Sequence, residues 1–354
     1  MGIIVSKFGG SSTANARNMK RVARLVRASP SRRCAVLSAP GIDGEHREKV
    51  TAMLDRCWDS RKQTAAFEGA VSAVAERFRE ICEGLGVPDM TPLVRRTLYR
   101  AANISLPHLL SRGEYLCALL FSRYTGLPAM DAASLIAFDA GDTLDEARTR
   151  RNLRCVADSE KAVIVPGFYG ADAEGRVHIL PRNGSDISGA IIAAGMDADL
   201  FENWTDVPGL MTADPAIVPE ARLIPHVSYR QMRALSRAGA QVLHPACLDP
   251  VAMAGIPTRL RCTMHPESFG TLIDERCDRV APCVVGRRSA PLPSRPEIKA
   301  SCISVFGVPE AKARAAAESL GALEVRRDGD AARIYVEAPE YEDRLRRLHG
   351  ALIL

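Results

Sequence analysis

The sequence has few aromatic residues and no long hydrophobic run. Phenylalanine, tryptophan and tyrosine make up 5% of its 354 residues, and no basic segment is interleaved with aromatics. A surface that stacks nucleic-acid bases is therefore not expected. The net charge of +5 permits anionic ligands but does not indicate a polyanionic partner. No apolar stretch approaches the roughly 20 residues that a membrane-spanning helix needs, so we expect neither nucleic acid nor a membrane as a partner.

The ten cysteines lack the spacing of a metal site or a redox motif. No Cys-x-x-Cys pair occurs, and no cysteine–histidine cluster has zinc-finger spacing. Several cysteines, such as Cys34 and Cys82, lie among apolar residues and are predicted to be reduced core side chains. The chain begins with a strand pattern and not with a charged segment before an apolar run, so no signal peptide is expected. These features favour a cytoplasmic setting.

The sequence does have a long alternation of strand and helix patterns. This alternation predicts an α/β fold with three αβα layers, in which helices cover both faces of an open, mostly parallel sheet. A proline-rich segment, 290–296, predicts a linker. The pattern beyond it reads as βαββαβ, a small α+β ferredoxin-like unit whose last strand is expected at 351–354. The expected organisation is a large domain (1–275), a linker (276–300) and a small domain (301–354).

A glycine turn follows the first expected strand. Lys7, Gly9, Gly10 and Ser11 come directly after a short β-branched run and before a helical pattern. Glycines allow a backbone to approach an anion closely, and a lysine can reach over the anion as a point charge. The lysine precedes the glycines, so this is not the phosphate loop in which a lysine closes the turn. Taken alone, the segment fits a phosphate-binding turn and a plain turn with an exposed lysine equally well.

Two further segments place charged residues at expected helix starts. Glu114, in SRGE, is either a residue that favours the helix N-terminus or a carboxylate that binds a substrate ammonium. Arg182, in RNGSD, has the planar fork that matches a carboxylate. Asp186 in the same segment either orients Lys7 or a metal, or serves only the helix dipole.

Seven motifs occur in order over residues 1–275: SKFGGSS, SAPG with KVTAML, SRGEYL, VPGFYG, RNGSD, WTDVPGLMTADP and AGAQVLHP. Together they resemble the aspartate kinases of the amino-acid kinase superfamily. The tail resembles an ACT regulatory unit. The resemblance implies transfer of the γ-phosphoryl group of ATP, with Mg²⁺, to the side-chain carboxylate of L-aspartate, which gives 4-phospho-L-aspartate. Catalysis of this kind is positioning and charge neutralisation.

The resemblance also implies the role of each site residue. Lys7 and Asp186 would be catalytic, with Lys7 bridging the transferred group. The substrate would be bound by Thr51, Glu114, Phe168, Arg182 and Ser185, with Arg182 on the α-carboxylate and Glu114 on the α-ammonium. The nucleotide would be bound by Lys7, Gly9, Gly10, Ser11, Thr205, Asp206, Met211 and Asp214. No residue is assigned as a metal ligand.

Three positions depart from the pattern of the family. Asn183 replaces a glycine and is expected to crowd or re-aim the helix start. Ala216 and Gln241 replace an arginine and a lysine, which is expected to weaken ATP binding or slow the transfer. The tail has room for one ACT-like unit where these kinases usually carry two, so reduced feedback inhibition is expected. ACT units often pair edge strands between subunits, so the resemblance also implies a homodimer. Two alternatives remain open: a kinase of the same fold that acts on an aspartate analogue, and a catalytically weak regulatory homologue.

Overall fold

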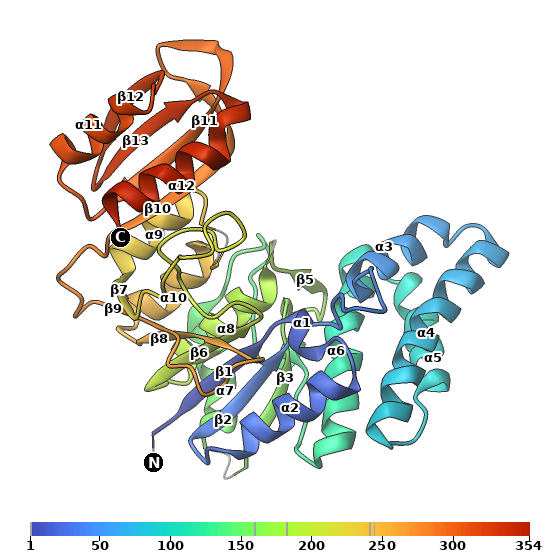
Figure 1. Ribbon diagram of the computed structural model, residues 1–354. Helices are drawn as coiled ribbons and strands as arrows, with labels where there is room; N and C mark the ends of the chain where they lie inside the picture. The colour runs from blue at the N-terminus through green and yellow to red at the C-terminus, as the bar shows by residue number, and fades with distance from the viewer. Residues whose placement is uncertain (1, 159–160, 182, 241, 244) are drawn as a thin grey trace. The chain divides into compact units, whose positions relative to one another are not determined.

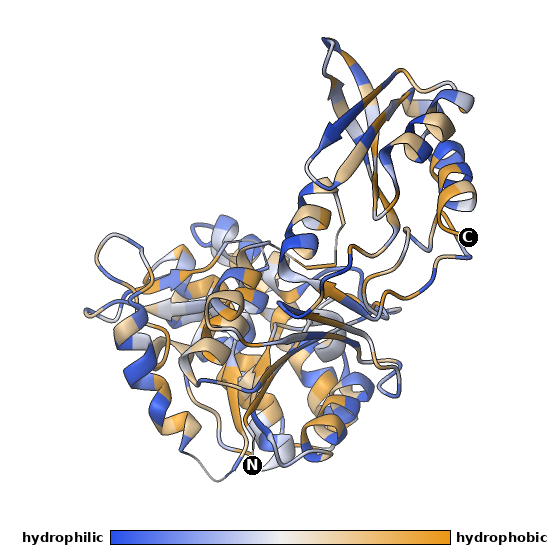
Figure 2. Ribbon diagram, turned by 90° about the vertical axis from the view of Figure 1, so that its left-hand side faces the viewer, coloured by the Kyte–Doolittle hydropathy of each residue, from blue (hydrophilic) through white to orange (hydrophobic). Residues whose placement is uncertain are grey.

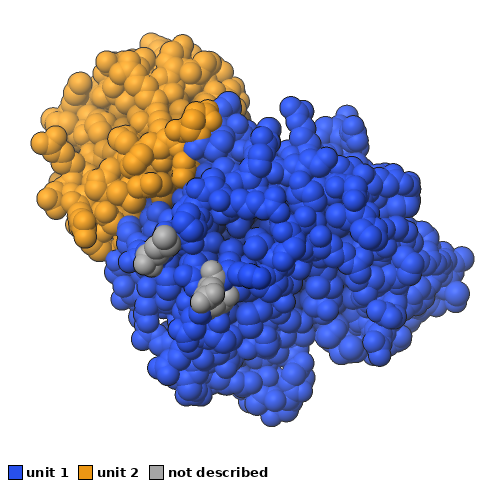
Figure 3. All heavy atoms as spheres, turned by 90° about the horizontal axis from the view of Figure 1, so that it is seen from below, with its two compact units in different colours: residues 1–206, 249–258, 262–266 blue, residues 207–248, 259–261, 267–354 orange. Residues whose placement is uncertain are grey.

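The computed structural model describes residues 2–158, 161–181, 183–240, 242–243 and 245–354. The chain divides into two compact units (Figure 3). Unit 1 comprises residues 1–206, 249–258 and 262–266, and unit 2 comprises residues 207–248, 259–261 and 267–354. The predicted boundary near residue 275 therefore differs from the division by contacts, in which 207–248 belong to the same unit as the C-terminal sheet. No helix of the described residues is long and apolar enough to cross a membrane.

Unit 1 is built on parallel strands, as predicted. The hydrogen-bonded order is β3-β2-β1-β6, and each neighbouring pair is parallel. These strands are β1 (Ile4–Phe8), β2 (Arg32–Leu37), β3 (Val163–Pro166) and β6 (Leu200–Thr205). Nearly all of their residues are buried, as expected for a sheet that is covered on both faces. A separate antiparallel hairpin pairs β4 (Tyr169–Ala171) with β5 (Val177–Ile179).

Helices surround these strands. The helix α8 packs on β1, and α6 packs on β3 (Figure 1). The hydrophobic core is formed mainly by β1, β2 and the helices from α2 to α6. Figure 2 shows hydrophobic residues gathered on the strands and hydrophilic residues along the outer surfaces of the helices. The helices that begin in unit 1 are α1 (Gly10–Thr13), α2 (Ala16–Arg27), α3 (Val50–Ser60), α4 (Thr64–Leu85), α5 (Thr91–Ala102), α6 (Leu106–Thr125), α7 (Glu146–Ala157) and α8 (Gly184–Gly195).

Unit 2 contains a short parallel strand pair and an antiparallel sheet. β7 (His226–Ser228) pairs in parallel with β9 (Thr271–Asp274), and α9 (Tyr229–Ala238) follows β7. The four-stranded sheet has the order β10-β11-β13-β12 and is antiparallel throughout. Its elements are β10 (Cys283–Leu292), β11 (Arg295–Phe306), α11 (Glu310–Ser319), β12 (Glu324–Asp328), β13 (Ala331–Val336) and α12 (Tyr341–Leu352). Two further elements, α10 (Leu248–Met253) and β8 (Thr258–Cys262), contain residues of both units.

Two secondary-structure predictions in this region are wrong. The proline-rich segment is the turn and flanks of the β10–β11 hairpin and not a linker. Pro291 is tolerated because β10 is an edge strand, where a missing N–H does not interrupt the ladder, and Pro296 lies outside the part of β11 that pairs with β13. The expected last strand is also absent, because α12 continues to Leu352, and Leu345, Leu348 and Leu352 form one buried helical face. The fourth strand of the sheet, β10, thus precedes the βαββα run and does not follow it.

Candidate active site

Lys7 and Asp186 form an ion pair at the centre of unit 1. Lys7 lies on β1, and Asp186 lies in the first turn of α8. Lys7 Nζ is 2.5 Å from Asp186 Oδ1, and the two side chains are 8% and 17% exposed. Asn203, the register partner of Lys7 on β6, donates from Nδ2 to the same carboxylate oxygen at 3.1 Å. The lysine is therefore held in one position, with its ammonium close to the glycine turn.

The glycine turn is tied to the loop that follows β2. Gly9 N donates to Trp204 O at 3.1 Å, and Gly41 N donates to Gly10 O at 2.9 Å. A Cβ built on Gly9 would lie 3.4 Å from Lys7 Nζ, so this backbone is directly beside the ammonium. Ser11 is half-buried in the short helix α1. The turn thus presents backbone groups next to a fixed cation, which is an arrangement suited to an anion.

Glu114 lies in the middle of a helix and not at its start. The helix α6 begins at Leu106, because Ser105 accepts a hydrogen bond from His108 N at 3.2 Å and Pro107 is tolerated in the first turn. The reading of Glu114 as a residue at the helix N-terminus is therefore wrong.

The Glu114 side chain is buried and has an unsatisfied oxygen. The residue is 5% exposed, and its Oε2 has no hydrogen-bond partner among the described residues. Burial raises the pKa of Glu114 from 4.5 to about 7, while the Ala39 N–H, Lys7 and the Ser185 hydroxyl favour the ionised form. A buried carboxylate with an open acceptor is suited to receive a cationic group.

Phe168 and Ser185 meet at the start of α8. Phe168 has a φ of +81°, which is strained for a residue with a side chain, and its N–H donates to Ser188 Oγ at 2.9 Å. A Cβ on Gly167 would lie 2.7 Å from Ser185 Cβ, so the strand end and the helix start are in close contact. Strained residues held in this way often line functional sites.

Thr51 is half-buried in the first turn of α3. Its neighbour Val50 donates from N to Pro40 O at 3.0 Å. This bond ties the turn to the loop of Gly41, which in turn contacts the glycine turn.

Of the eight residues expected to bind the nucleotide, the last four are divided between the units. Thr205 and Asp206 end β6 in unit 1, and Thr205 Oγ1 donates to Asp206 Oδ1 at 3.1 Å. Met211 and Asp214 belong to unit 2. There they line a cavity of about 650 Å³, together with parts of β10, α9 and α12. The cavity is in the range that small organic ligands occupy.

Two of the predicted positions, Arg182 and Gln241, lie outside the described residues. Asn183 is described and adopts a left-handed conformation with φ of 65°. Asparagine tolerates this region better than most residues, and the Asn183 side chain is exposed. The helix α8 begins directly after it. The expected crowding of the helix start is therefore not observed.

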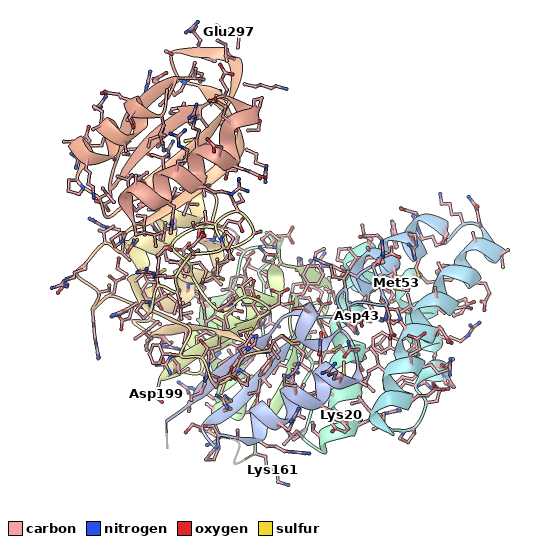
Figure 4. All side chains as sticks on the ribbon, in the orientation of Figure 1. Lys20, Asp43, Met53, Lys161, Asp199 and Glu297 are labelled. Carbon is pink, nitrogen blue, oxygen red and sulfur yellow. The ribbon has the colours of Figure 1, made fainter. Side chains whose placement is uncertain are left out.

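Arg77 was not predicted, although it holds the two loops of the site. It lies on α4, is 3% exposed, and donates from Nη2 to Ala14 O at 2.7 Å and to Gly41 O at 3.0 Å. Asp43, labelled in Figure 4 in the loop that leads to α3, is 3.6 Å from the same nitrogen. Burial lowers the pKa of Arg77. Arg77 follows Val74 by three residues and so lies on the buried face of the helix, and this spacing could have indicated a buried arginine from the sequence.

Thr263 was also missed by the sequence analysis. Its N–H donates to Thr205 O at 2.9 Å, and its Oγ1 is 2.7 Å from Ser12 Oγ. The end of β6 and the segment of the glycine turn are thereby joined through one residue, by its backbone N–H and its hydroxyl. No sequence signal marked this residue.

The sequence matches a known protein family. The family model described as "Amino acid kinase family" matches residues 2–262. The chain is 32% identical to aspartokinase 3 of Bacillus subtilis, over 80% of this chain and 66% of that protein. It is 29% identical to the lysine-sensitive aspartokinase 3 of Escherichia coli, over 77% of this chain and 64% of that protein. The chain thus spans less than two thirds of the length of these relatives.

Solved structures of aspartate kinases share this fold. The structure of Clostridium acetobutylicum aspartate kinase matches with a TM-score of 0.85 and 25% identity, over 99% of this chain and 100% of that one. E. coli aspartokinase III in complex with aspartate and ADP matches with a TM-score of 0.80 and 21% identity, over 99% and 100%. The second likeness concerns the fold alone.

Proposed function

Because the chain belongs to the amino acid kinase family, we propose that it transfers the γ-phosphoryl group of ATP to the side-chain carboxylate of L-aspartate. The observation that carries the proposal is the buried Glu114 carboxylate, whose Oε2 has no partner among the described residues. Lys7, which is paired with Asp186, contributes to the pKa of this carboxyl. An acceptor for a substrate ammonium thus accompanies a fixed cation for a phosphoryl group, as an amino-acid kinase requires.

In the proposed reaction an oxygen of the aspartate side chain attacks the γ-phosphorus of ATP. The bond from phosphorus to the oxygen that bridges the β- and γ-phosphates breaks, and ADP leaves. The attacking carboxylate is ionised at neutral pH, so no general base is needed. Lys7 neutralises charge on the transferred group, and Asp186 with Asn203 keeps the ammonium in place. Glu114 holds the substrate ammonium, and Thr51, Phe168 and Ser185 shape the pocket around it.

ATP is expected to enter as its Mg²⁺ complex. The described residues contain no group of three or more His, Cys, Asp or Glu side chains that could hold a metal ion. Mg²⁺ that enters with a nucleotide is commonly held by substrate phosphates, water and one or two carboxylates. The metal would supply charge neutralisation between the β- and γ-phosphates. We propose that Gly9, Gly10 and Ser11 contact the phosphates, and that Thr205, Asp206, Met211 and Asp214 contact the rest of the nucleotide.

The proposal is tested by trapping the acyl phosphate. Protein, ATP, Mg²⁺ and hydroxylamine are mixed with L-aspartate, and hydroxamate is read by colour. We expect hydroxamate with aspartate and its loss in Glu114→Ala and Lys7→Ala. Absence of hydroxamate with aspartate, in protein that is shown to be folded, would contradict the assignment.

A second candidate is a kinase that acts on an aspartate analogue in a specialised pathway. Asn183 at the start of α8 motivates it, since this exposed side chain adjoins the segment that carries Ser185 and Asp186. Hydroxamate that forms with an analogue and not with aspartate would establish this reading. The third reading is a catalytically weak homologue, motivated by the uncharged Ala216. ATP and Mg²⁺ that bind without any hydroxamate, over a panel of acceptors, would favour it.

We also propose reduced feedback inhibition, a homodimer and a cytoplasmic location. The support for reduced inhibition is that unit 2 holds a single four-stranded sheet with α11 and α12. Inhibition by micromolar lysine or threonine would contradict it. The edge strands of this sheet support the dimer, which light scattering tests. The ten cysteines are all unpaired, which suits a reducing compartment.

A further inference from the structure

The segment 207–225, which we call the nucleotide loop, has little regular structure of its own. Its two arms meet at an isolated bridge between Met211 and Leu223. Its inward side chains Ala213, Ile217 and Val218 are 2–5% exposed. They belong to the same hydrophobic cluster as the helix-facing side of the C-terminal sheet and α12. The loop is therefore packed as part of unit 2 and does not depend on its own secondary structure.

Three hydrogen bonds join this loop to the C-terminal elements. Val284, on β10, donates from N to Thr212 O at 2.8 Å. Arg346, on α12, donates from Nε to Ile217 O at 2.8 Å. His349, also on α12, has its Nε2 2.9 Å from Thr212 Oγ1. Two of the three bonds thus converge on Thr212, the residue that follows Met211.

Thr212 also closes the loop on itself. Its N–H donates to Arg222 O at 2.8 Å, and its Oγ1 accepts from Arg222 N at 2.9 Å. The backbone of both arms of the loop is therefore paired at this residue. A displacement of the Thr212 side chain would therefore disturb Arg222 in the second arm as well as the backbone beside Met211.

His349 is fully buried and uses only one of its ring nitrogens. Nε2 meets Thr212, whereas Nδ1 has no hydrogen-bond partner among the described residues. A protonated ring would bury an N–H without an acceptor, which is unfavourable. Burial accordingly lowers the pKa of His349, Arg222 lowers it further, and Glu220 raises it. The ring is thus neutral near pH 7 and fixed by its bond to Thr212.

We propose that His349 is a positioning residue that, through Thr212, holds the nucleotide loop in the conformation that presents Met211 and Asp214 to ATP. The inference rests on the proposed kinase activity and extends it. It gives the single C-terminal sheet a role that requires no effector. A loop that is ordered before binding avoids the cost of ordering it when the ligand arrives.

The first test measures loop order directly in the full-length, unliganded protein. Amide hydrogen exchange over residues 208–225 is compared for wild type, His349→Leu, Thr212→Val and the double variant. Loss of the bond to His349 is expected to speed exchange about three- to tenfold in His349→Leu. Thr212→Val also loses the bond from Arg222 N and should speed exchange at least as much. The double variant is expected to match Thr212→Val, because that variant already lacks the bond to His349. Arg347→Gln, at an exposed position of the same helix, is the control and should leave exchange unchanged.

The second test separates positioning from general damage. The KM for ATP is expected to rise about three- to tenfold in His349→Leu, with kcat and the KM for aspartate nearly unchanged. His349→Gln, whose amide can reach Thr212, is expected to recover most of the ATP affinity. Exchange at the wild-type rate in Thr212→Val, or equal losses in all kinetic constants, would overturn the inference.

The outcomes also separate this inference from the proposed function. Wild type without acyl-phosphate formation would remove the kinase assignment, whereas the exchange result would still decide whether His349 orders the loop. If His349→Leu does not fold, the nearly isosteric Thr212→Val, which removes the bond to His349 together with the bond from Arg222 N, serves in its place.

Discussion

The backbones of Gly10 and Gly41 are in direct contact. Gly41 N donates to Gly10 O at 2.9 Å, and a Cβ built on Gly41 would lie 2.6 Å from the Gly10 carbonyl carbon. Two loops that are far apart in the sequence thus meet beside Lys7 with no room for a side chain. This contact therefore helps to fix the position of the glycine turn.

Gly41→Ala is therefore expected to push the two loops apart. Its neighbours at this point are backbone atoms that cannot rotate away, so we expect a loss of about 1–3 kcal/mol in the free energy of unfolding and a higher KM for ATP. Urea denaturation and steady-state kinetics measure both. Gly44→Ala is the matched control, because a Cβ there meets no atom within 4 Å. Equal behaviour of the two variants would contradict the role of the contact.

Lys7→Met is expected to lower kcat about 10²–10³-fold, since it removes a preorganised charge from the transferred group. Substrate binding should change much less. Asp186→Asn keeps the lysine but loses its anionic partner, and we expect a smaller loss in kcat. Lys20→Met, on the exposed face of α2 (Figure 4), is the control. A Lys7→Met enzyme with near-normal kcat would exclude the proposed role.

If Glu114 binds the substrate ammonium as proposed, aspartate binding is expected to depend on pH. Its pKa is about 7 in the folded, unliganded protein, and only the ionised form pairs with an ammonium. The ratio kcat/KM for aspartate should therefore fall as the pH drops below 7, because this ratio reports the free enzyme. Glu114→Gln should have a high KM for aspartate and lose this pH dependence. A wild-type profile that is flat between pH 6 and 8 would contradict the assignment.

The same pKa has the opposite effect on stability. The folded pKa of Glu114 lies above 4.5, so the folded chain holds more protons than the unfolded chain between about pH 4.5 and 7. The neutral form therefore contributes on the order of 3 kcal/mol to the free energy of unfolding. This contribution is complete below pH 4.5 and is lost as the pH rises to about 7. Glu114→Gln should therefore unfold at a higher denaturant concentration than wild type at pH 8. Equal midpoints at pH 8 would argue against the burial cost.

The fold was predicted well wherever the pattern was local and regular. Alternating strands and helices, and the buried stripe of α4, follow from apolar spacing alone. The prediction failed at prolines. Pro107 lies in the first turn of α6 and does not end a helix, and the prolines of 290–296, which predicted a linker, lie in the β10–β11 hairpin. In both cases the location of the missing N–H decides the effect of a proline, and sequence alone does not give that location.

The sequence marked the candidate residues of the site but not the residues that support them. Lys7, Glu114 and Asp186 stand in motifs, whereas Arg77 and Thr263 act through bonds that join distant segments. Such contacts depend on loop geometry that only the folded chain reveals. Of these two residues, Arg77 could have been noticed in the sequence, because it is a charged residue at a position that the helical period assigns to the core.

Arg77→Met is expected to destabilise the fold and to loosen the site. The guanidinium donates to the carbonyls of Ala14 and Gly41, and both acceptors would lose their charged donor in the variant. Hydrogen bonds to charged groups contribute about 1.5–3 kcal/mol each, although the buried Nε and Nη1 lack partners among the described residues and offset part of this gain. We expect a net loss of about 1–3 kcal/mol. Arg79→Met, on the exposed side of the same helix, should cost much less, because exposed ion pairs contribute little to stability.

Ala216→Arg tests the missing cation of the nucleotide loop. Ala216 is exposed, and its N–H donates to Asp214 Oδ1 at 2.9 Å. A long side chain at this position therefore has room, and the backbone bond to Asp214 does not depend on it. A restored guanidinium that reaches a phosphate should improve the KM for ATP by about three- to tenfold. Ala216→Gln, which adds length without charge, should leave the KM nearly unchanged. If both variants behave alike, the absence of this arginine does not limit ATP binding, and a basic residue elsewhere in the chain serves the triphosphate.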